Sequence, residues 1–408
     1  MIMPKKVVLI LAFVLIASLE AAGAQYSVRK YGVKPGNSPE VNTLRLQKAI
    51  DKISVQGGIL YVEPVEGGYP IKSGIILRKN VSLVGAHGPT GRGTVASESD
   101  SKPTGSLFVI TDTDGPAFTV ESATRIEGCQ FYYPEQAWND PSKIIQYPPT
   151  ISMSQEVPVQ GVTLRNLTFY GEYIAMDFRA RKPQICEQIL FEHCYGYPLS
   201  GQFIAIDRCY DIPRLLHLHV NPANMRLFGK SFSWKVIDAV VSQKNYTFWI
   251  DYTDNAQLMD VFTFGNYGGA YLGPNTYGQL TNFNFDCVTV GIFKDGGNSS
   301  NRNWQIAQGS IIANTGSDIN NIHPIVITGE GHTSLVSVEA FSGMNGALST
   351  LGSSYDYLYV SGDKPLTVSI VGCRMQGYQA ANPFTITNSK AKVKAVNCIN
   401  KEGNFFSK

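Results

Sequence analysis

The sequence predicts an all-β fold, a parallel β-helix solenoid with a short N-terminal capping helix. A four-residue pattern, Ile-Ala-Met-Asp at 174–177, returns as Ile-Ala-Ile-Asp at 204–207, and Phe-Trp-Ile-Asp at 248–251 ends a third unit. Apolar β-type segments recur about every 25 residues between 164 and 393 without alternating helices, which is typical of a β-solenoid. A jelly roll or propeller would show closely spaced Asn-Gly or Asp-Gly hairpin turns, and these are scarce.

Residues 1–24 have the pattern of a secretory signal peptide. Lys5 and Lys6 precede an apolar run at 7–19, and Ala22-Gly23-Ala24 supplies the cleavage site. The apolar run is shorter than the ~20 residues of a membrane-spanning helix. We therefore expect a secreted or periplasmic protein in which residues 25–408 form a single β-helix domain.

Residues 25–95 are expected to form the N-terminal cap and the first coils. A helix is predicted over 43–53, where Leu46, Ala49, Ile50 and Ile53 recur at helical spacing. Such a helix would cover the sheet edge that a solenoid leaves open at its end. Strands are predicted at 26–32, 59–62, 75–77 and 81–85.

Two stretches interrupt the repeat. Residues 132–158 are rich in Tyr, Pro and Trp and are expected to form a long loop. Residues 221–245 are inserted between the second and third Asp units, and their apolar spacing predicts a short amphipathic helix. Insertions in a solenoid project from one face, which is often the binding face.

Composition narrows the range of partners. The chain of 408 residues has a formal net charge of +2, and only 16% of its residues are charged. A nearly neutral chain lacks the electrostatic footprint of a protein that binds nucleic acid or an anionic membrane. We therefore expect neither of these partners.

Seven cysteines, an odd number, argue against a disulfide framework. Cys194, Cys287, Cys373 and Cys398 each end an apolar segment and are predicted to be buried in the core. Cys186 and Cys209 are left as an alternative pair in an oxidising compartment. No Cys or His spacing is typical of a zinc site, so no metal is predicted.

The opening segment resembles the N-terminal cap of the pectate-lyase-like superfamily of right-handed parallel β-helix proteins. The matching residues are Tyr31-Gly32, Leu-Gln-Lys-Ala-Ile-Asp at 46–51, Gly-Gly-Ile-Leu-Tyr-Val at 57–62 and Val-Ser-Leu-Val-Gly at 81–85. The resemblance implies a right-handed helix and kinship with rhamnogalacturonase- or epimerase-type carbohydrate enzymes and phage tailspike-like proteins. One departure is Lys-Pro-Gly-Asn-Ser at 34–38, where the family usually has an acidic run.

The catalytic patterns of the best-known family members are missing. The Asp-Asp pair of polygalacturonases is absent, and Gly-Glu-Gly-His at 329–332 only loosely resembles their His motif. The acidic calcium cluster of pectate lyases is not evident either, so calcium is not indicated and no cofactor is predicted. The resemblance thus implies carbohydrate chemistry without specifying the reaction.

The recurring aspartates are the first catalytic candidates. If Asp177, Asp207 and Asp251 occupied equivalent coil positions, neighbouring carboxylates would lie ~4.8 Å apart. Glycosidases use two carboxylates, and crowding raises the pKa of the one that acts as the acid. The alternative is that each Asp caps a turn after its strand.

Two histidines are the second catalytic candidates. His217 and His219 alternate along one predicted strand and so share a face. They could act as a base and a hydrogen-bond donor, or bind a metal with a nearby carboxylate. The alternative is an exposed polar ladder without a function.

Arginines and aromatic residues near the same coils are candidates for substrate binding. Arg179, Arg208 and Arg214 could bind the carboxylate of a uronic acid, or could simply be solvated at the surface. Trp138, Trp249 and Tyr252 could stack on sugar rings, or could anchor loops.

The sequence therefore favours an exported glycoside hydrolase that cleaves a polysaccharide, pectic or otherwise acidic, in a lateral groove. A polysaccharide lyase that acts on a uronan by β-elimination is the first alternative. A non-catalytic glycan-binding or structural β-helix is the second. The expected partner in each case is a polysaccharide or oligosaccharide, and a homotrimer, the assembly of many β-helix proteins, stays open.

Overall fold

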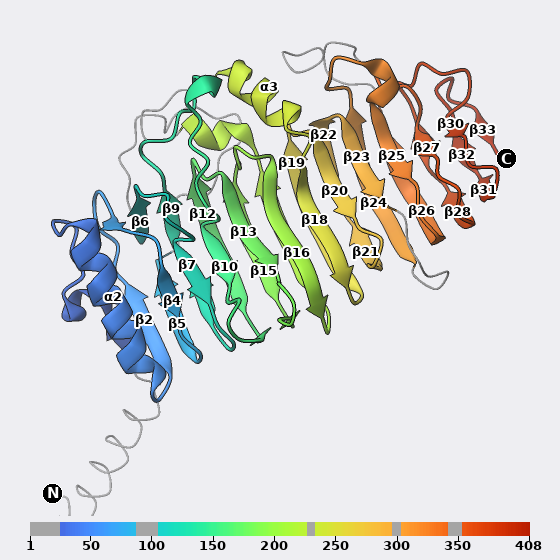
Figure 1. Cartoon of the computed structure of the whole chain (residues 1–408). Coiled ribbons are helices and arrows are strands. Elements are labelled where there is room, and N and C mark those ends of the chain that lie inside the picture. The colour runs from blue at the N-terminus through green and yellow to red at the C-terminus, as the bar shows by residue number, and fades with distance from the viewer. Residues whose placement is uncertain (1–24, 87–104, 227–232, 296–302, 342–352) are drawn as a thin grey trace, which may run out of the picture.

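The computed structural model describes residues 25–86, 105–226, 233–295, 303–341 and 353–408. Coils of parallel strands stack along one axis into a right-handed β-helix, with the helix α2 at the N-terminal end and the chain end beyond β33 at the other (Figure 1). The predicted fold class is confirmed. The proposed signal peptide lies outside the described residues.

Each coil contributes strands to two sheets. The 13-stranded sheet contains β4 (Ile75–Leu77), β7 (Phe118–Val120), β10 (Ile151–Met153), β11 (Val159–Gln160), β13 (Ile174–Arg179), β14 (Cys186–Glu187), β16 (Gln202–Tyr210), β18 (Tyr246–Thr253), β20 (Gly268–Leu272), β23 (Val290–Lys294), β25 (His323–Ile327), β27 (Leu358–Val360) and β30 (Phe384–Ile386).

The 20-stranded sheet forms the remaining wall. Its strands are parallel except for the last pair, β32 and β33. They are β1 (Gln25–Ser27), β2 (Gly58–Val62), β3 (Tyr69–Ile71), β5 (Val81–Gly85), β6 (Leu107–Ile110), β8 (Arg125–Glu127), β9 (Gln130–Tyr132), β12 (Thr163–Tyr170), β15 (Leu190–Gly196), β17 (Arg214–Val220), β19 (Ala256–Phe264), β21 (Gly278–Thr281), β22 (Asn284–Val288), β24 (Trp304–Ala313), β26 (Gly331–Ala340), β28 (Leu366–Val371), β29 (Arg374–Met375), β31 (Ala391–Val396), β32 (Cys398–Ile399) and β33 (Phe405–Phe406).

Alternation along the strands separates the core from the surface. In β13, Met176 and Phe178 are fully buried, whereas Asp177 and Arg179 point outward and are half-buried. Phe178 pairs with Ile206 of β16, which in turn pairs with Ile250 of β18. Each core position therefore continues as a row of apolar side chains through successive coils.

A column of left-handed residues bends the strands of the 20-stranded sheet. Asn166, His193, His217 and Asp260 have φ angles of 52°, 51°, 51° and 56°. The residues flanking each of them pair across β12, β15, β17 and β19, so these bends follow one another in successive coils. The column divides the outer surface of this sheet into two faces.

The cap helix α2 (Pro39–Ser54) begins four residues before the predicted range and ends one residue after it. Ser38 caps its N-terminus, and Pro39 suits the first turn because its missing N–H needs no partner there. The four apolar residues used to predict the helix are all buried.

The predicted strand at 26–32 is wrong beyond Ser27. Only β1 pairs with β2, and a 3-10 helix, η1 (Val28–Tyr31), follows it. The Ser27 hydroxyl accepts a hydrogen bond from the Lys30 backbone N–H at 3.3 Å, and Gly32 ends the turn with a φ of 87°. A capping side chain and a glycine thus override the β-type composition.

The two insertions differ from each other. Residues 132–158 are not a loop throughout, because β10 within them forms a rung between β7 and β13, with Ile151 and Met153 buried. The predicted helix in 221–245 is confirmed as α3 (Trp234–Ser242), capped by Ser233. Three further 3-10 helices are η2 (Pro141–Lys143), η3 (Pro222–Arg226) and η4 (Ile319–Asn321).

All seven cysteines are buried free thiols, including the four predicted to lie in the core. Cys186 and Cys209 are register partners on β14 and β16 but are not bonded to each other. Within the described part of the chain, no helix is both long and apolar enough to span a bilayer.

Candidate functional site

The candidate site lies on the outward face of the 13-stranded sheet, where two pockets meet at Arg179. The first, of 750 Å³, extends toward the N-terminus over β4, β7 and β10. The second, of 540 Å³, extends toward the C-terminus over β16, β18 and β20. We call the two together the groove. Its charged and aromatic lining includes Arg78, Glu121, Glu156, Asp177, Arg179, Arg181 and Asp207 in the first pocket, and Tyr173, Lys244, Tyr246, Trp249 and Tyr271 in the second.

The register of the strands corrects the predicted column of three aspartates. Asp207 pairs with Asp251, as expected, but Arg179 pairs with Asp207 and Asp177 pairs with Ala205. The first copy of the repeat is thus shifted by two residues. A two-residue shift keeps every side chain on the same face of the sheet, so the apolar pattern could not reveal it.

Asp177 holds Arg179 in place. One carboxylate oxygen, Oδ1, accepts hydrogen bonds from the backbone N–H and Nε of Arg179 at 3.0 and 2.9 Å, and Oδ2 accepts one from Nη2 at 2.5 Å. This bidentate pair fixes the guanidinium beside Asp207 and 5.9 Å from the ring centre of Trp249. Asp177 is thereby a positioning residue for Arg179.

Asp207 lines the first pocket, and its register partner Asp251, which is not a lining residue of either pocket, lies next to it on β18 in different surroundings. Burial raises the pKa of Asp207, and the negative charge of Asp251 raises it further. The buried Oδ1 of Asp207 has no hydrogen-bond partner among the described residues. By contrast, Oδ1 of Asp251 accepts hydrogen bonds from the backbone N–H groups of Tyr252 at 2.7 Å and Asn275 at 3.2 Å. The raised pKa suits Asp207 to donate a proton, and the two backbone N–H groups hold the Asp251 carboxyl group in a fixed orientation.

An aromatic ladder continues the groove from the carboxylate pair. Trp249, Tyr271 and Phe293 hold the same register position on β18, β20 and β23. Their rings stack at centroid distances of 5.5 and 5.9 Å, with interplanar angles of 6° and 10°. All three are half-buried and point outward. Of these three residues, only Trp249 was predicted to bind a substrate. The constant spacing of 22 residues between the three aromatic residues indicates equivalent positions in successive coils.

Two of the other predicted substrate-binding residues lie close to the carboxylates. Arg208 and Tyr252 directly follow Asp207 and Asp251, and the Arg208 guanidinium lies 4.8 Å from the Tyr252 ring centre. The Tyr252 ring also contacts Tyr210, edge to face, at 6.0 Å.

The remaining two do not lie in the groove. Trp138 is 2% exposed and packs against Gly171, so it anchors its loop and offers no open face to a sugar. Arg214 begins β17 of the 20-stranded sheet, where it pairs with Leu190 and Gln257.

The structure places the two candidate histidines away from the groove, on β17 of the 20-stranded sheet. His217 occupies the left-handed bend, and its Nδ1 lies 2.6 Å from Oδ2 of Asp260. His219 stacks on Phe262 at 4.5 Å, and burial lowers its pKa. The solenoid core separates these histidines from the carboxylate pair, so they do not form one site with it.

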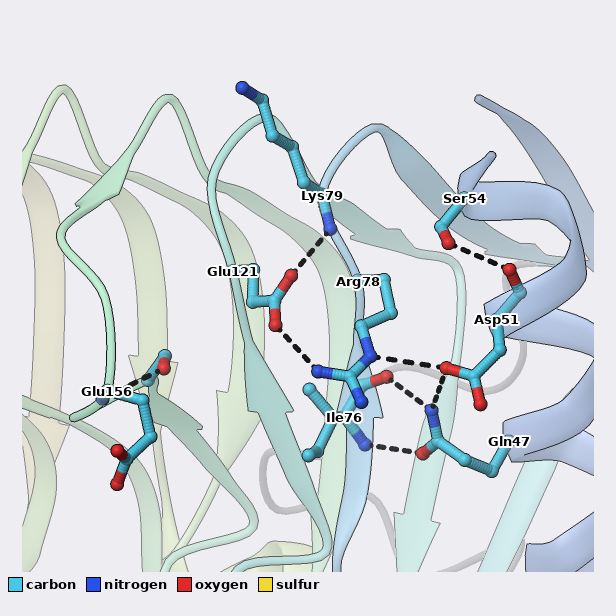
Figure 2. Close-up of polar contacts among 9 residues, drawn as sticks. Gln47, Asp51, Ser54, Ile76, Arg78, Lys79, Glu121 and Glu156 are labelled. Carbon is cyan, nitrogen blue, oxygen red and sulfur yellow. Dashed lines mark hydrogen bonds and ion pairs between the residues drawn. The ribbon is translucent and has the colours of Figure 1, made fainter. Parts of the chain in front are cut away.

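Polar contacts tie the N-terminal end of the groove to the cap helix. Figure 2 shows Arg78 between Asp51 of α2 and Glu121, at 3.2 and 2.9 Å. Gln47 of α2 also exchanges two hydrogen bonds with the backbone of Ile76, at 2.8 and 3.1 Å. Arg78 and Glu121 line the first pocket, so the cap contributes to its wall.

Among the described residues, no group of three or more His, Cys, Asp or Glu side chains is arranged to hold a metal ion.

Comparison with known proteins shows similarity in structure only. No family model and no curated protein sequence matches the chain. A mutant DFA-IIIase from Arthrobacter chlorophenolicus A6 in complex with DFA-III matches with a TM-score of 0.57 at 11% identity, over 94% of this chain and 93% of that chain. The same enzyme in complex with GF2 matches with a TM-score of 0.53 at 12% identity and the same coverage. An exopolygalacturonase from Thermotoga maritima has a TM-score of 0.44 at 11% identity, over 94% and 93%. At these identities, the two matches above 0.5 show a shared fold.

Proposed function

We propose that the protein is a carbohydrate-active enzyme that hydrolyses glycosidic bonds in the groove, with Asp207 as the acid and Asp251 as the nucleophile. The observation that carries the proposal is the pairing of these residues on adjacent strands, with a raised pKa at Asp207 and backbone hydrogen bonds at Asp251. The fold shared with an enzyme solved in complex with DFA-III supports it.

The strand geometry favours a mechanism that retains the anomeric configuration. Register partners on adjacent strands lie ~4.8 Å apart, close to the ~5–5.5 Å that separates the two carboxyl groups of retaining glycosidases. In the first step, Asp207 donates its proton to the glycosidic oxygen. An oxygen of Asp251 bonds to the anomeric carbon as the bond to the leaving sugar breaks.

In the second step, water attacks the anomeric carbon of the glycosyl ester. The Asp207 carboxylate takes the proton of this water, and Asp251 leaves as a carboxylate. Arg179, held by Asp177, binds a hydroxyl or carboxylate of the sugar beside the reacting bond. The outward edges of Trp249, Tyr271 and Phe293 form an apolar surface that runs across the strands, and the apolar parts of the sugars lie on it.

The groove also suggests which polysaccharides to test. Arg78, Arg179 and Arg181 line the first pocket together with acidic side chains. The carboxylates of an acidic glycan could lie beside these arginines, so pectic polysaccharides are among the substrates to test.

We further propose that the protein is exported after cleavage behind Ala24, which N-terminal sequencing of the secreted protein would test.

The first experiment incubates residues 25–408 with a panel of pectins, uronans and neutral glycans, and measures reducing ends and ultraviolet absorbance together. We expect reducing ends without absorbance, and a loss of at least about 10³-fold in kcat for Asp207→Asn and for Asp251→Asn. Asp363→Asn, an exposed carboxylate outside the groove, is the matched control and should keep full activity.

Other outcomes identify the alternatives. Ultraviolet absorbance from an unsaturated product would replace hydrolysis by β-elimination. Binding of glycans without any product would leave a binding or structural β-helix. Full activity of both Asp variants would rule out the carboxylate pair as the catalytic machinery.

A further inference from the structure

We propose that the protein has a second saccharide-binding pocket, beside the groove, which takes one neutral sugar that branches from the glycan bound in the groove. This pocket of 470 Å³ lies between the C-terminal half of α3 and the turn that follows β24. That the bound sugar is a branch of the glycan in the groove rests on the proposed function. That the pocket binds a neutral sugar rests on its own lining residues. We call it the branch pocket.

The lining of the branch pocket has the chemistry of a sugar site. Ser242 and Asn321 present a hydroxyl and an amide at exposed positions, and Asp238 presents a carboxylate. These groups match the vicinal hydroxyls of a sugar, which both donate and accept hydrogen bonds. Tyr267 adds a half-buried aromatic wall for the apolar face of a pyranose ring.

The charge balance selects a neutral sugar. Two carboxylates, Asp238 and Asp318, line the branch pocket, against one cation, Lys244. Asp318 is held in place, because it accepts hydrogen bonds from the Asn320 backbone N–H at 3.0 Å and from the Asn321 amide at 2.7 Å. No arginine is among the described residues that line the branch pocket, so a uronate would lack the planar guanidinium that binds a carboxylate at two points, whereas three arginines line the first pocket of the groove.

The branch pocket joins the groove at two residues. Lys244 lines both the branch pocket and the second pocket of the groove. The ring of Tyr246 lies 5.7 Å from Tyr271 in the aromatic ladder and also 5.7 Å from Tyr267, against which it packs edge to face. Tyr246 therefore lies between the aromatic ladder and the Tyr267 wall of the branch pocket, and Lys244 borders both spaces, so we expect a single-sugar branch on a backbone unit bound beside Tyr271 to enter the branch pocket.

An unpaired hydroxyl in the wall supports a polar ligand. Thr289 lines the branch pocket and is 5% exposed, and its Oγ1 has no hydrogen-bond partner among the described residues. A buried hydroxyl without a partner is destabilising. Rotation about χ1 turns this oxygen toward the pocket, where a sugar hydroxyl would pair with it.

The test fills the branch pocket without touching the groove. Ser242→Trp, at the exposed end of α3, places an indole in the pocket, and Lys235→Trp places the same side chain on the same helix outside it. Saturation-transfer NMR with D-galactose, L-arabinose and D-galacturonate at millimolar concentration measures occupancy. We expect a neutral-sugar signal in the wild type and in Lys235→Trp and its loss in Ser242→Trp, whereas any D-galacturonate signal comes from the groove and should not change in Ser242→Trp.

Two further measurements separate this proposal from the proposed function. The NMR experiment repeated with Asp207→Asn should give an unchanged neutral-sugar signal, whether or not any glycan is cleaved. If a backbone is hydrolysed, Ser242→Trp should lower kcat/KM about tenfold for its branched form and leave the debranched form unchanged. Should Ser242→Trp fail to fold, Thr289→Val is expected to weaken neutral-sugar binding several-fold. A neutral-sugar signal that persists in Ser242→Trp, or in Thr289→Val at full strength, overturns the branch pocket.

Discussion

At the scale of single residues, the groove places a charged centre beside an apolar platform. Arg179 contacts both, because Asp177 directs its guanidinium toward Asp207 and over Trp249. A sugar bound here meets hydrogen-bonding groups on one side and the outward edge of an indole on the other. The two kinds of contact have different consequences when they are removed.

Trp249→Ala tests the platform. Since apolar contact with the indole acts on the bound sugar in both the ground state and the transition state, we expect KM to rise about tenfold with kcat changed by less than about twofold. Phe262→Ala is the matched control, because Phe262 also stacks on a neighbouring ring but lies on the 20-stranded sheet. Equal KM values for both variants would exclude Trp249 from substrate binding.

Glu172 is a buried carboxyl group whose ionisation changes the stability of the fold. Both of its carboxyl oxygens lack hydrogen-bond partners among the described residues, and burial raises its pKa from 4.5 to about 8. The folded state therefore holds the proton more tightly than the unfolded state. The resulting stabilisation is fully present below pH 4.5 and is lost as the pH rises to about 8.

Glu172→Gln should remove this pH dependence. We expect the variant to gain up to about 4 kcal/mol relative to the wild type between pH 5 and pH 8, because its side chain stays neutral throughout. Thermal unfolding of both proteins across this range measures the difference. Parallel stability curves would show that Glu172 titrates near its ordinary value in the folded protein.

At the scale of elements, the sequence pattern predicts which face a side chain occupies better than it predicts which neighbour it meets. The alternation of apolar residues places Asp177, Asp207 and Asp251 on the outward face, whereas the prediction that all three occupy equivalent positions holds only for Asp207 and Asp251. It could not fix the register of β13, because a shift by two residues leaves the buried positions apolar. The cap helix and the strands β2, β4 and β5 were predictable, since their signals are local.

The histidines show a second limit of prediction from sequence. His217 and His219 were correctly expected to point outward together, but nothing in one strand's pattern reveals which sheet it joins. For Trp138 the loop-anchoring alternative is confirmed, and the sequence could not decide it because burial of a loop residue depends on contacts with distant segments such as Gly171.

The column of bends makes a prediction about His217. Its φ of 51° is tolerated by Asn but disfavoured for a β-branched residue. We expect His217→Val to lose about 1–2 kcal/mol of stability and His217→Asn to lose less, with activity on glycans unchanged in both. Denaturant unfolding and the reducing-end assay measure the two effects. A large loss of activity in a stable His217→Asn protein would show that this histidine takes part in catalysis.

At the scale of the whole molecule, α2 closes one end of a long parallel stack. Leu46, Ala49 and Ile50 of α2 are fully buried, and the helix contacts β2, β3 and β4. Without this cover, the first coil would expose an apolar core and strand edges that can pair with another chain.

Ile50→Asp tests the cap. A buried charge on the inner face of α2 should detach the helix, lower the unfolding temperature and produce larger species in light scattering coupled to gel filtration. Leu44→Asp changes the exposed face of the same helix, where Leu44 is 56% exposed, and should leave both properties unchanged. The same measurement on the wild type gives its oligomeric state. An Ile50→Asp protein with the size and stability of the wild type would show that the stack does not need this end cover.

The pairing of Asp207 with Asp251 across one strand boundary limits how such a site can vary. In a solenoid, the distance between equivalent positions comes in whole multiples of the strand spacing, about 4.8 Å for neighbours and about 9.6 Å across one intervening coil. The first value falls near the separation of retaining glycosidases and the second near the upper limit for inverting ones. The stereochemistry of the product would then follow from an integer, the number of coils between two carboxylates. Inserting one coil between β16 and β18 would switch it without replacing either residue.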